Sequence, residues 1–186
     1  MTDNGMDQPQ MFGERIWLRP IELRDALVIA ESTHDVDPDW APAPNPPVSE
    51  TAFRNWVQSL DETELVWAVC RTDQQEAIGT ASIRNIDLRH RVAETGMGLL
   101  NPEDRGQGIG QEVKALILDF AFDVMGMHSV RCTVDSRNER SQRSVEKSGY
   151  KRAGVLTADI RAGMGQFADT IVYQLLESEW RARKEG

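Results

Sequence analysis

The sequence has few basic residues relative to its acidic ones. It contains 21 lysine and arginine residues against 30 aspartate and glutamate residues, a formal net charge of −9 over 186 residues. Binding to nucleic acid needs a basic face, so this balance argues against a DNA or RNA partner. A negatively charged surface attracts cations over long range, and it also keeps a protein soluble. The charge is therefore consistent with a cationic substrate or with solubility alone.

Long apolar runs, an apolar leader and metal-ligand spacings are also missing. The chain has no run of about 18 apolar residues, the length that a membrane span needs, and its first ten residues are polar. We therefore expect no membrane partner, no secretion signal and a cytoplasmic protein. Cys70 and Cys132 lie in apolar strand-like runs and predict buried free thiols. His34, His90 and His128 are scattered, so we expect no metal site.

The pattern of apolar residues predicts one α+β domain with a mixed, mostly antiparallel sheet. We expect residues 1–11 to form a flexible tail, 12–178 a single domain and 179–186 a charged C-terminal tail. Five prolines between Asp37 and Pro47 exclude regular helix in that stretch. The predicted order is β-α-α-β-β-β-α-β-α-β-β. Its elements span residues 14–21, 22–34, a helix capped by Ser49, 64–71, 77–86, 91–100, 107–125, 129–134, 141–148, a strand after Tyr150, and 170–176.

The most informative stretch is residues 101–110, which read Asn-Pro-Glu-Asp-Arg-Gly-Gln-Gly-Ile-Gly. Its alternating glycines follow a strand-like run and precede a helix-like one. Glycine amides can approach a ligand closely, and the start of a helix offers unpaired amides and a positive dipole end. No Gly-Lys-Ser/Thr closes the turn, so it is not a P-loop. The strand before it ends an antiparallel meander, which does not suit a dinucleotide fingerprint. The turn predicts a site for a phosphate.

Two ordered segments carry a family resemblance. Residues 105–110, Arg-Gly-Gln-Gly-Ile-Gly, resemble the Arg/Gln-x-x-Gly-x-Gly/Ala signature of the GNAT superfamily of N-acetyltransferases. Residues 138–141, Asn-Glu-Arg-Ser, and 146–150, Glu-Lys-Ser-Gly-Tyr, resemble that family's second conserved segment. Residues 15–20 and the proline stretch around Trp40 are similar to the RimJ/RimL branch, which acetylates protein N-termini and related amines. The resemblance implies a sheet of about six to seven strands flanked by helices and splayed between its fourth and fifth strands.

The resemblance also implies acetyl-CoA as cosubstrate and no metal. The backbone amides of Arg105, Gly106, Gln107, Gly108, Ile109 and Gly110 would hold the pyrophosphate of the cofactor. Met97, Leu99 and Leu100 would contact the pantetheine and the thioester carbonyl through their backbone. Asn138 would bond the cofactor arm, with a loop turn as the alternative role.

Direct acetyl transfer needs an unprotonated amine, a polarised carbonyl and a proton for the leaving thiolate. Glu94 is the candidate base, acting through water; the alternative is a carboxylate that orients a cationic substrate or faces solvent. The position that holds a tyrosine acid in many family members is Val145, so that role does not transfer. Ser141 is the candidate acid and a further cofactor contact, and helix capping is its alternative. Trp40 and Trp56 are candidates for the acceptor pocket, or else pack structurally.

The function predicted from the sequence is therefore an acetyl-CoA-dependent N-acetyltransferase. Its acceptor would be a primary amine, either a protein N-terminus or a small cationic amine, and a homodimer is an open expectation from the resembling branch. A catalytically silent acyl-CoA-binding sensor or interaction module is the alternative, kept open by Val145.

Overall fold

The structure is a computed structural model that describes residues 8–25, 28–29, 49–162 and 165–185. Most of the predicted helix 22–34 and all of the proline stretch, including Trp40, lie outside these residues. Among the described residues no helix is long and apolar enough to cross a membrane. Cys70 and Cys132 are buried free thiols, as the sequence predicts.

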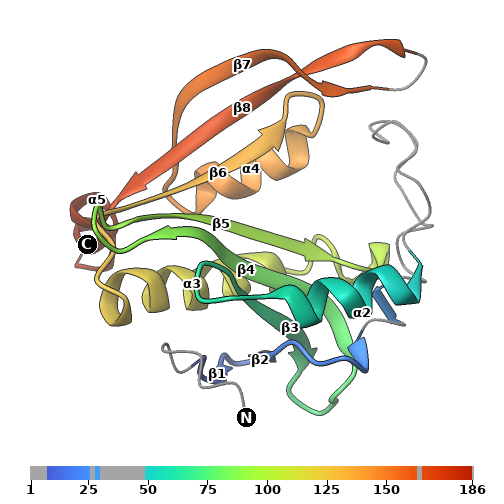
Figure 1. The fold of residues 1–186 in the computed structure, drawn as a ribbon. Helices are drawn as coiled ribbons and strands as arrows, with labels where there is room; N and C mark the ends of the chain where they lie inside the picture. Colours follow the sequence, from blue (N-terminus) through green and yellow to red (C-terminus); the bar gives the residue numbers. More distant parts are fainter. Residues whose placement is uncertain (1–7, 26–27, 30–48, 163–164, 186) are drawn as a thin grey trace.

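One open sheet organises the fold (Figure 1). Its strand order is β1-β2-β3-β4-β5-β6-β8-β7, and every neighbouring pair except β5 and β6 is antiparallel. The sheet has eight strands rather than six to seven, because Met11 and Phe12, at the end of the predicted tail, pair with Leu18 and Trp17. The strands are Met11–Phe12 (β1), Ile16–Pro20 (β2), Leu65–Arg71 (β3), Ala77–Asp87 (β4), Val92–Leu99 (β5), Ser129–Asp135 (β6), Lys151–Arg161 (β7) and Phe167–Leu176 (β8).

The sheet opens between β5 and β6. These strands pair in parallel only where Val92–Glu94 meets Ser129–Arg131. Beyond that short ladder they spread apart, and in Figure 1 β5 stays with β4 while β6 turns away with β8. The predicted splay is confirmed, although β1 makes these the fifth and sixth strands of the chain. Each strand of the open pair therefore has backbone groups without a partner strand along part of its length.

Helix α3 (Ile109–Asp119) packs on the sheet beside this opening. Ile109, Val113 and Ile117 recur at helical spacing and are buried in the main core. The sequence predicts one helix over 107–125, whereas the α-helix begins after Gly108 and passes into a π-helical turn at Phe120–Val124. The turn keeps Phe120 in the core, where its ring meets Trp67 edge-on at 5.5 Å between centroids.

The described residues also include three further α-helices and the short 3-10 helix η1 (Pro102–Asp104) before the glycine turn. Ser49 caps α2 (Glu50–Ser59) as predicted, because its side chain accepts a hydrogen bond from the Ala52 amide at 3.2 Å. Helix α4 (Glu139–Lys147) follows β6. Most of the stretch expected as a charged C-terminal tail is helical, since Glu177–Lys184 form α5. Trp180 anchors this helix: it is buried against Phe122, with ring centroids 5.1 Å apart.

Candidate active site

The glycine turn gives α3 an open N-terminus. Gly106 and Gly108 have φ values of 75° and 84°, a left-handed conformation that favours glycine. Gly108 is the N-cap residue of α3. Within the described part of the chain, the amides of residues 106–110 have no intramolecular hydrogen-bond acceptor. They are therefore available to an anion, which the helix dipole also favours.

Arg15, in the turn between β1 and β2, is hydrogen-bonded to the glycine turn and to helix α3. Its Nη1 donates to the Gln107 carbonyl at 2.6 Å, and its Nε donates to Glu112 at 3.0 Å. Its own backbone amide also donates to Glu112, at 2.9 Å. Burial alone raises the pKa of Glu112, but these hydrogen bonds outweigh it and hold that pKa below its ordinary value. The sequence does not predict these hydrogen bonds, because Arg15 and its partners lie about ninety positions apart in the chain.

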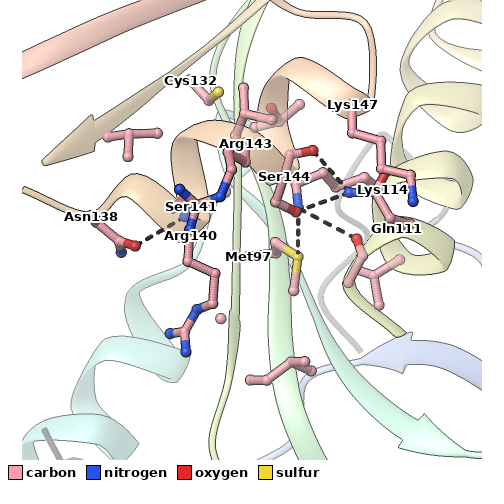
Figure 2. A pocket seen from close by; sticks show the side chains of 18 of the residues that line it. Met97, Gln111, Lys114, Cys132, Asn138, Arg140, Ser141, Arg143, Ser144 and Lys147 are labelled. Atoms are coloured by element: carbon pink, nitrogen blue, oxygen red, sulfur yellow. Dashed lines mark hydrogen bonds between the residues drawn. The ribbon is translucent and has the colours of Figure 1, made fainter. Parts of the chain in front are cut away.

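A cavity of about 550 Å³ lies where β5 and β6 separate, directly under the glycine turn. Its walls come from β5, β6, α3 and α4, and from Tyr150 after α4 (Figure 2). Although the chain is acidic, the described lining contains no aspartate or glutamate. It contains five cationic side chains, from Arg105, Lys114, Arg140, Arg143 and Lys147. The cavity therefore suits an anionic ligand with an elongated body.

Asn138 and Ser141 begin α4 at the cavity wall. Asn138 is the N-cap residue, and its Oδ1 accepts a hydrogen bond from the Ser141 amide at 3.0 Å. The alternative capping role for Ser141 is thereby filled by Asn138. The Ser141 hydroxyl has no hydrogen-bond partner among the described residues, and the residue lines the cavity. It can donate a hydrogen bond to a ligand there.

Lys114 is a cavity residue that the sequence reasoning missed. Its Nζ lies 2.8 Å from Ser144 Oγ, 3.5 Å from the Gly110 carbonyl oxygen and 3.5 Å from Met97 Sδ. Burial lowers the pKa of this lysine to about 8. Burial likewise raises the pKa of Cys132, across the cavity on β6, to about 12. An intramolecular contact between helices carries no sequence pattern, so only the fold reveals this cluster.

Tyr150 lines the cavity, and its hydroxyl is already hydrogen-bonded. Its hydroxyl is 2.6 Å from Thr95 Oγ1, and the residue is buried in the core. Burial raises its pKa far above the ordinary value. This placement gives Tyr150 a packing role, since a buried phenol with a high pKa gives up its proton reluctantly.

The structure brings together most of the predicted cofactor residues but not the acceptor residues. The cavity lining includes Met97, Leu99, Arg105, Gly106, Gly108, Gly110, Asn138 and Ser141. Leu100 and Gln107 lie outside that lining, and Ile109 is buried in the core, so only their backbone could meet a ligand. Arg105 also donates to the Leu99 carbonyl at 3.3 Å, which ties the turn to β5.

Glu94 and Trp56 stand apart from the cavity lining. The Glu94 carboxylate meets Arg131 Nε at 3.0 Å and Arg84 Nε at 3.8 Å, and its side chain is one-fifth exposed. Trp56, on α2, meets Phe53 edge-on with ring centroids 6.2 Å apart. Trp40 lies outside the described residues. The catalytic and acceptor roles of these residues stay predictions.

Comparison with known proteins identifies the fold. The family model of the acetyltransferase (GNAT) domain matches residues 15–151. The chain belongs to the GNAT family of acetyltransferases. The N-acetyltransferase YoaA of Bacillus subtilis is 31% identical over 111 residues, which is 60% of this chain and 62% of YoaA. This membership makes the chain an acetyltransferase, and its open sheet flanked by helices matches GNAT structures.

Two solved GNAT-fold structures match over nearly the whole chain. An acetyltransferase structure from T. thermophilus is 30% identical, covers 95% of this chain and 93% of its own, and has a TM-score of 0.75. RimJ of Mycobacterium smegmatis, in complex with CoA-disulfide, is 21% identical, with 88% and 83% covered and a TM-score of 0.76. At that identity the second match supports the fold alone.

Proposed function

We propose that this protein moves an acetyl group from acetyl-CoA directly to a primary amine, either a protein N-terminus or a small cationic amine. The observation that carries the proposal is the cavity at the open pair of strands. It has five cations and no carboxylate among its described lining residues, in a chain whose net charge is −9. Acetyl-CoA matches this pattern, because it joins a polyanionic nucleotide end to a narrow neutral arm.

The residues present fit the donor along its length. The free amides of residues 106–110, at the positive end of the α3 helix dipole, suit a diphosphate. The cationic side chains of Arg140, Arg143 and Lys147, on one helix of the wall, suit further phosphate charge. The unpaired part of β5 suits the amide groups of the pantetheine, which would lie against it like an added strand.

The chemistry of the transfer is assigned to two side chains as a proposal. Ser141 offers its free hydroxyl as a hydrogen-bond donor where the leaving sulfur would lie. Glu94 would accept a proton from the amine through water, or anchor a cationic amine. Because Arg131 and Arg84 already hold its carboxylate, an amine or a water that reaches Glu94 must share those contacts.

The acidic excess of the chain supports a cationic acceptor, since a negative surface raises the local concentration of amines that carry a positive charge. The resemblance to the RimJ/RimL branch supports a protein N-terminus. An amine panel separates these acceptors. It would contain a short peptide with a free α-amine, its N-terminally blocked twin, a polyamine and a neutral aromatic amine.

The test is the release of CoA thiol from acetyl-CoA, followed with each amine and without any amine. We expect release that depends on the amine and an acetylated product by mass spectrometry. The matched control is Gly108→Glu, which adds a negative charge and a strained residue to the turn, and it should abolish the signal. A silent acyl-CoA-binding module, the alternative that Val145 keeps open, would bind acetyl-CoA tightly and release no thiol with any amine.

Glu94→Gln then distinguishes its two proposed roles. A base role predicts a loss of kcat that a more basic reaction buffer partly restores, because the free amine no longer needs the carboxylate. An anchor role predicts a rise in KM for cationic amines and little change for the neutral amine. An unaltered kcat and KM for every amine would remove Glu94 from the site.

A further inference from the structure

Lys114 is a charged group inside the cavity with only neutral partners. Its ammonium meets a hydroxyl, a carbonyl oxygen and a thioether, from Ser144, Gly110 and Met97. Among the described residues it forms no ion pair, whereas Arg105 is tied to β5 and Arg143 pairs with Glu139 at 3.1 Å. A buried ammonium is costly unless an anion accompanies it. The arrangement therefore calls for an anionic group from a ligand.

The groups around Lys114 do not supply that anion. On β6 it faces the Cys132 thiol, whose raised pKa keeps it protonated. On β5 the lining side chains are uncharged, and Tyr150 is bound to Thr95. On α4 the titratable lining residues are Arg140, Arg143 and Lys147, which add positive charge. Every described wall of the cavity is thus neutral or cationic.

The place of Lys114 narrows the choice of anion. The lysine lies one helical turn beyond Gly110, and Ser144 Oγ holds its Nζ between α3 and α4 (Figure 2). Its Nζ touches Met97, on the part of β5 that the proposed donor would line with its thioester end. The free amides of the glycine turn already serve the diphosphate end. The anion that appears near the thioester is the sulfur that leaves during transfer.

We propose that Lys114 is the proton donor to the leaving sulfur of CoA. This rests on the proposed acetyl transfer. As the amine nitrogen forms its bond to the carbonyl carbon, the carbon–sulfur bond breaks and its electron pair stays on sulfur. Lys114 Nζ gives that sulfur a proton and becomes neutral, while the amine nitrogen loses its proton to a base or to water. Solvent then returns a proton to Lys114, and charge and atoms balance.

The acidity of Lys114 suits this step. Its pKa of about 8 is close to the roughly 8.5 of an ordinary thiol, so the proton moves with little cost in either direction. The Val145 side chain cannot donate a proton, and the Tyr150 hydroxyl is engaged with Thr95. Ser141 remains a hydrogen-bond donor to the same sulfur, but a serine hydroxyl is far less acidic than this ammonium.

The first experiment titrates the thiol of bound CoA by the ultraviolet absorbance of the thiolate, so it needs no turnover. In the wild type we expect the bound thiol to ionise at lower pH than in Lys114→Met, because the ammonium favours the nearby thiolate. Lys114→Arg keeps the positive charge and should titrate like the wild type. The control Lys151→Met makes the same change at an exposed lysine that does not line the cavity. Identical titrations in wild type and Lys114→Met would overturn the placement of Lys114.

The second experiment measures turnover with a neutral aromatic amine, whose own protonation does not change with pH in the working range. We expect Lys114→Met to lower kcat by about 100-fold, the usual size of a general-acid effect, with a much smaller change in KM. Lys114→Arg should stay slow, since a guanidinium does not release its proton near neutral pH. In the wild type kcat should fall as pH rises through the pKa of the lysine in the complex.

Three outcomes count against the proposal. Recovery of kcat in Lys114→Arg would mean that a fixed charge suffices. A rise in Kd for CoA with unchanged kcat in Lys114→Met would mean that the lysine holds phosphate. An unchanged pH profile would mean that no proton comes from it. If no amine supports turnover in the wild type, the transfer proposal fails, and the thiol titration still tests Lys114.

Discussion

Replacing Lys114 with methionine should stabilise the protein at neutral pH. Burial lowers the pKa of this lysine from 10.5 to about 8. At ~1.4 kcal/mol for each pKa unit, keeping the ammonium charged at pH 7 costs the folded state ~3 kcal/mol. Methionine has a similar length and no charge, but it loses the bond to Ser144, worth ~1 kcal/mol. Ser144 keeps Gln111 as a donor at 2.9 Å, so its oxygen is not left unsatisfied. We therefore expect a net gain of ~2 kcal/mol.

The pH dependence gives this prediction its sign. Between the folded pKa of about 8 and the ordinary value of 10.5, the unfolded chain binds a proton that the folded chain has lost. The wild type therefore gains stability as pH rises through this window. The advantage of Lys114→Met should be complete below pH 8 and disappear between pH 8 and 10.5. Above 10.5 the variant should be less stable by the ~1 kcal/mol of the lost hydrogen bond.

Urea unfolding followed by tryptophan fluorescence at several pH values measures this advantage. Lys151→Met, at a lysine whose side chain is 71% exposed, is the control and should change stability little. A variant that is less stable than the wild type at pH 7, or a difference that does not vary with pH, would refute the reasoning.

Three further predictions concern the turn and the start of α4. Gly108→Glu should lower acetyl-CoA affinity at least tenfold by calorimetry, because a positive φ strains any side chain there, its Cβ would lie 3.2 Å from Arg15 Nη2 and displace that arginine, and the added carboxylate repels phosphate. Unchanged affinity would disprove the phosphate assignment. Glu112→Gln should weaken the contact between Arg15 and Glu112 by ~1 kcal/mol. The variant should also lose less stability than the wild type as pH falls through the lowered pKa of Glu112, which acid unfolding of both proteins would measure. Ser141→Ala should lower kcat more than it raises the Kd of acetyl-CoA, since its hydroxyl has no structural partner among the described residues, and an unaltered rate would remove it from the reaction.

The parts of the fold that follow local rules could be predicted from sequence. The glycine turn is one, because left-handed backbone at Gly106 and Gly108 needs glycine and the following helix needs an apolar stripe. The split beside β5 followed from recognising two ordered segments rather than from strand patterns. Helix α5 was missed because one tryptophan among charged residues carries its whole buried face, and that face exists only once Phe122 is in place.

The residues of the candidate site likewise divide into those that the sequence predicts and those that only the tertiary fold reveals. Residues that act through backbone, such as those of the turn, follow from the motif. Lys114 and Arg15 do not, since each works through a partner that only the tertiary fold brings near. Glu94 shows the converse limit. Its position on the strand is as predicted, yet the arginines that form ion pairs with its carboxylate come from β4 and β6. No local sequence pattern predicts such ion pairs between neighbouring strands.

The five cavity cations cannot all have the same purpose. Arg143 is 70% exposed in its side chain and Lys147 is exposed, so each can attract a phosphate at little cost while water still solvates it. Lys114 differs, because its ammonium is buried against a hydroxyl, a carbonyl oxygen and a thioether, and only a ligand inside the cavity can contact it. Burial lowers the pKa of Lys114 to about 8, so its positive charge costs the folded protein stability, as the charge of an exposed lysine does not. A buried lysine that lowers stability in the absence of ligand is most simply explained by a ligand that becomes anionic beside it. Within acetyl transfer, the ligand atom that becomes anionic is the sulfur of the departing thiolate.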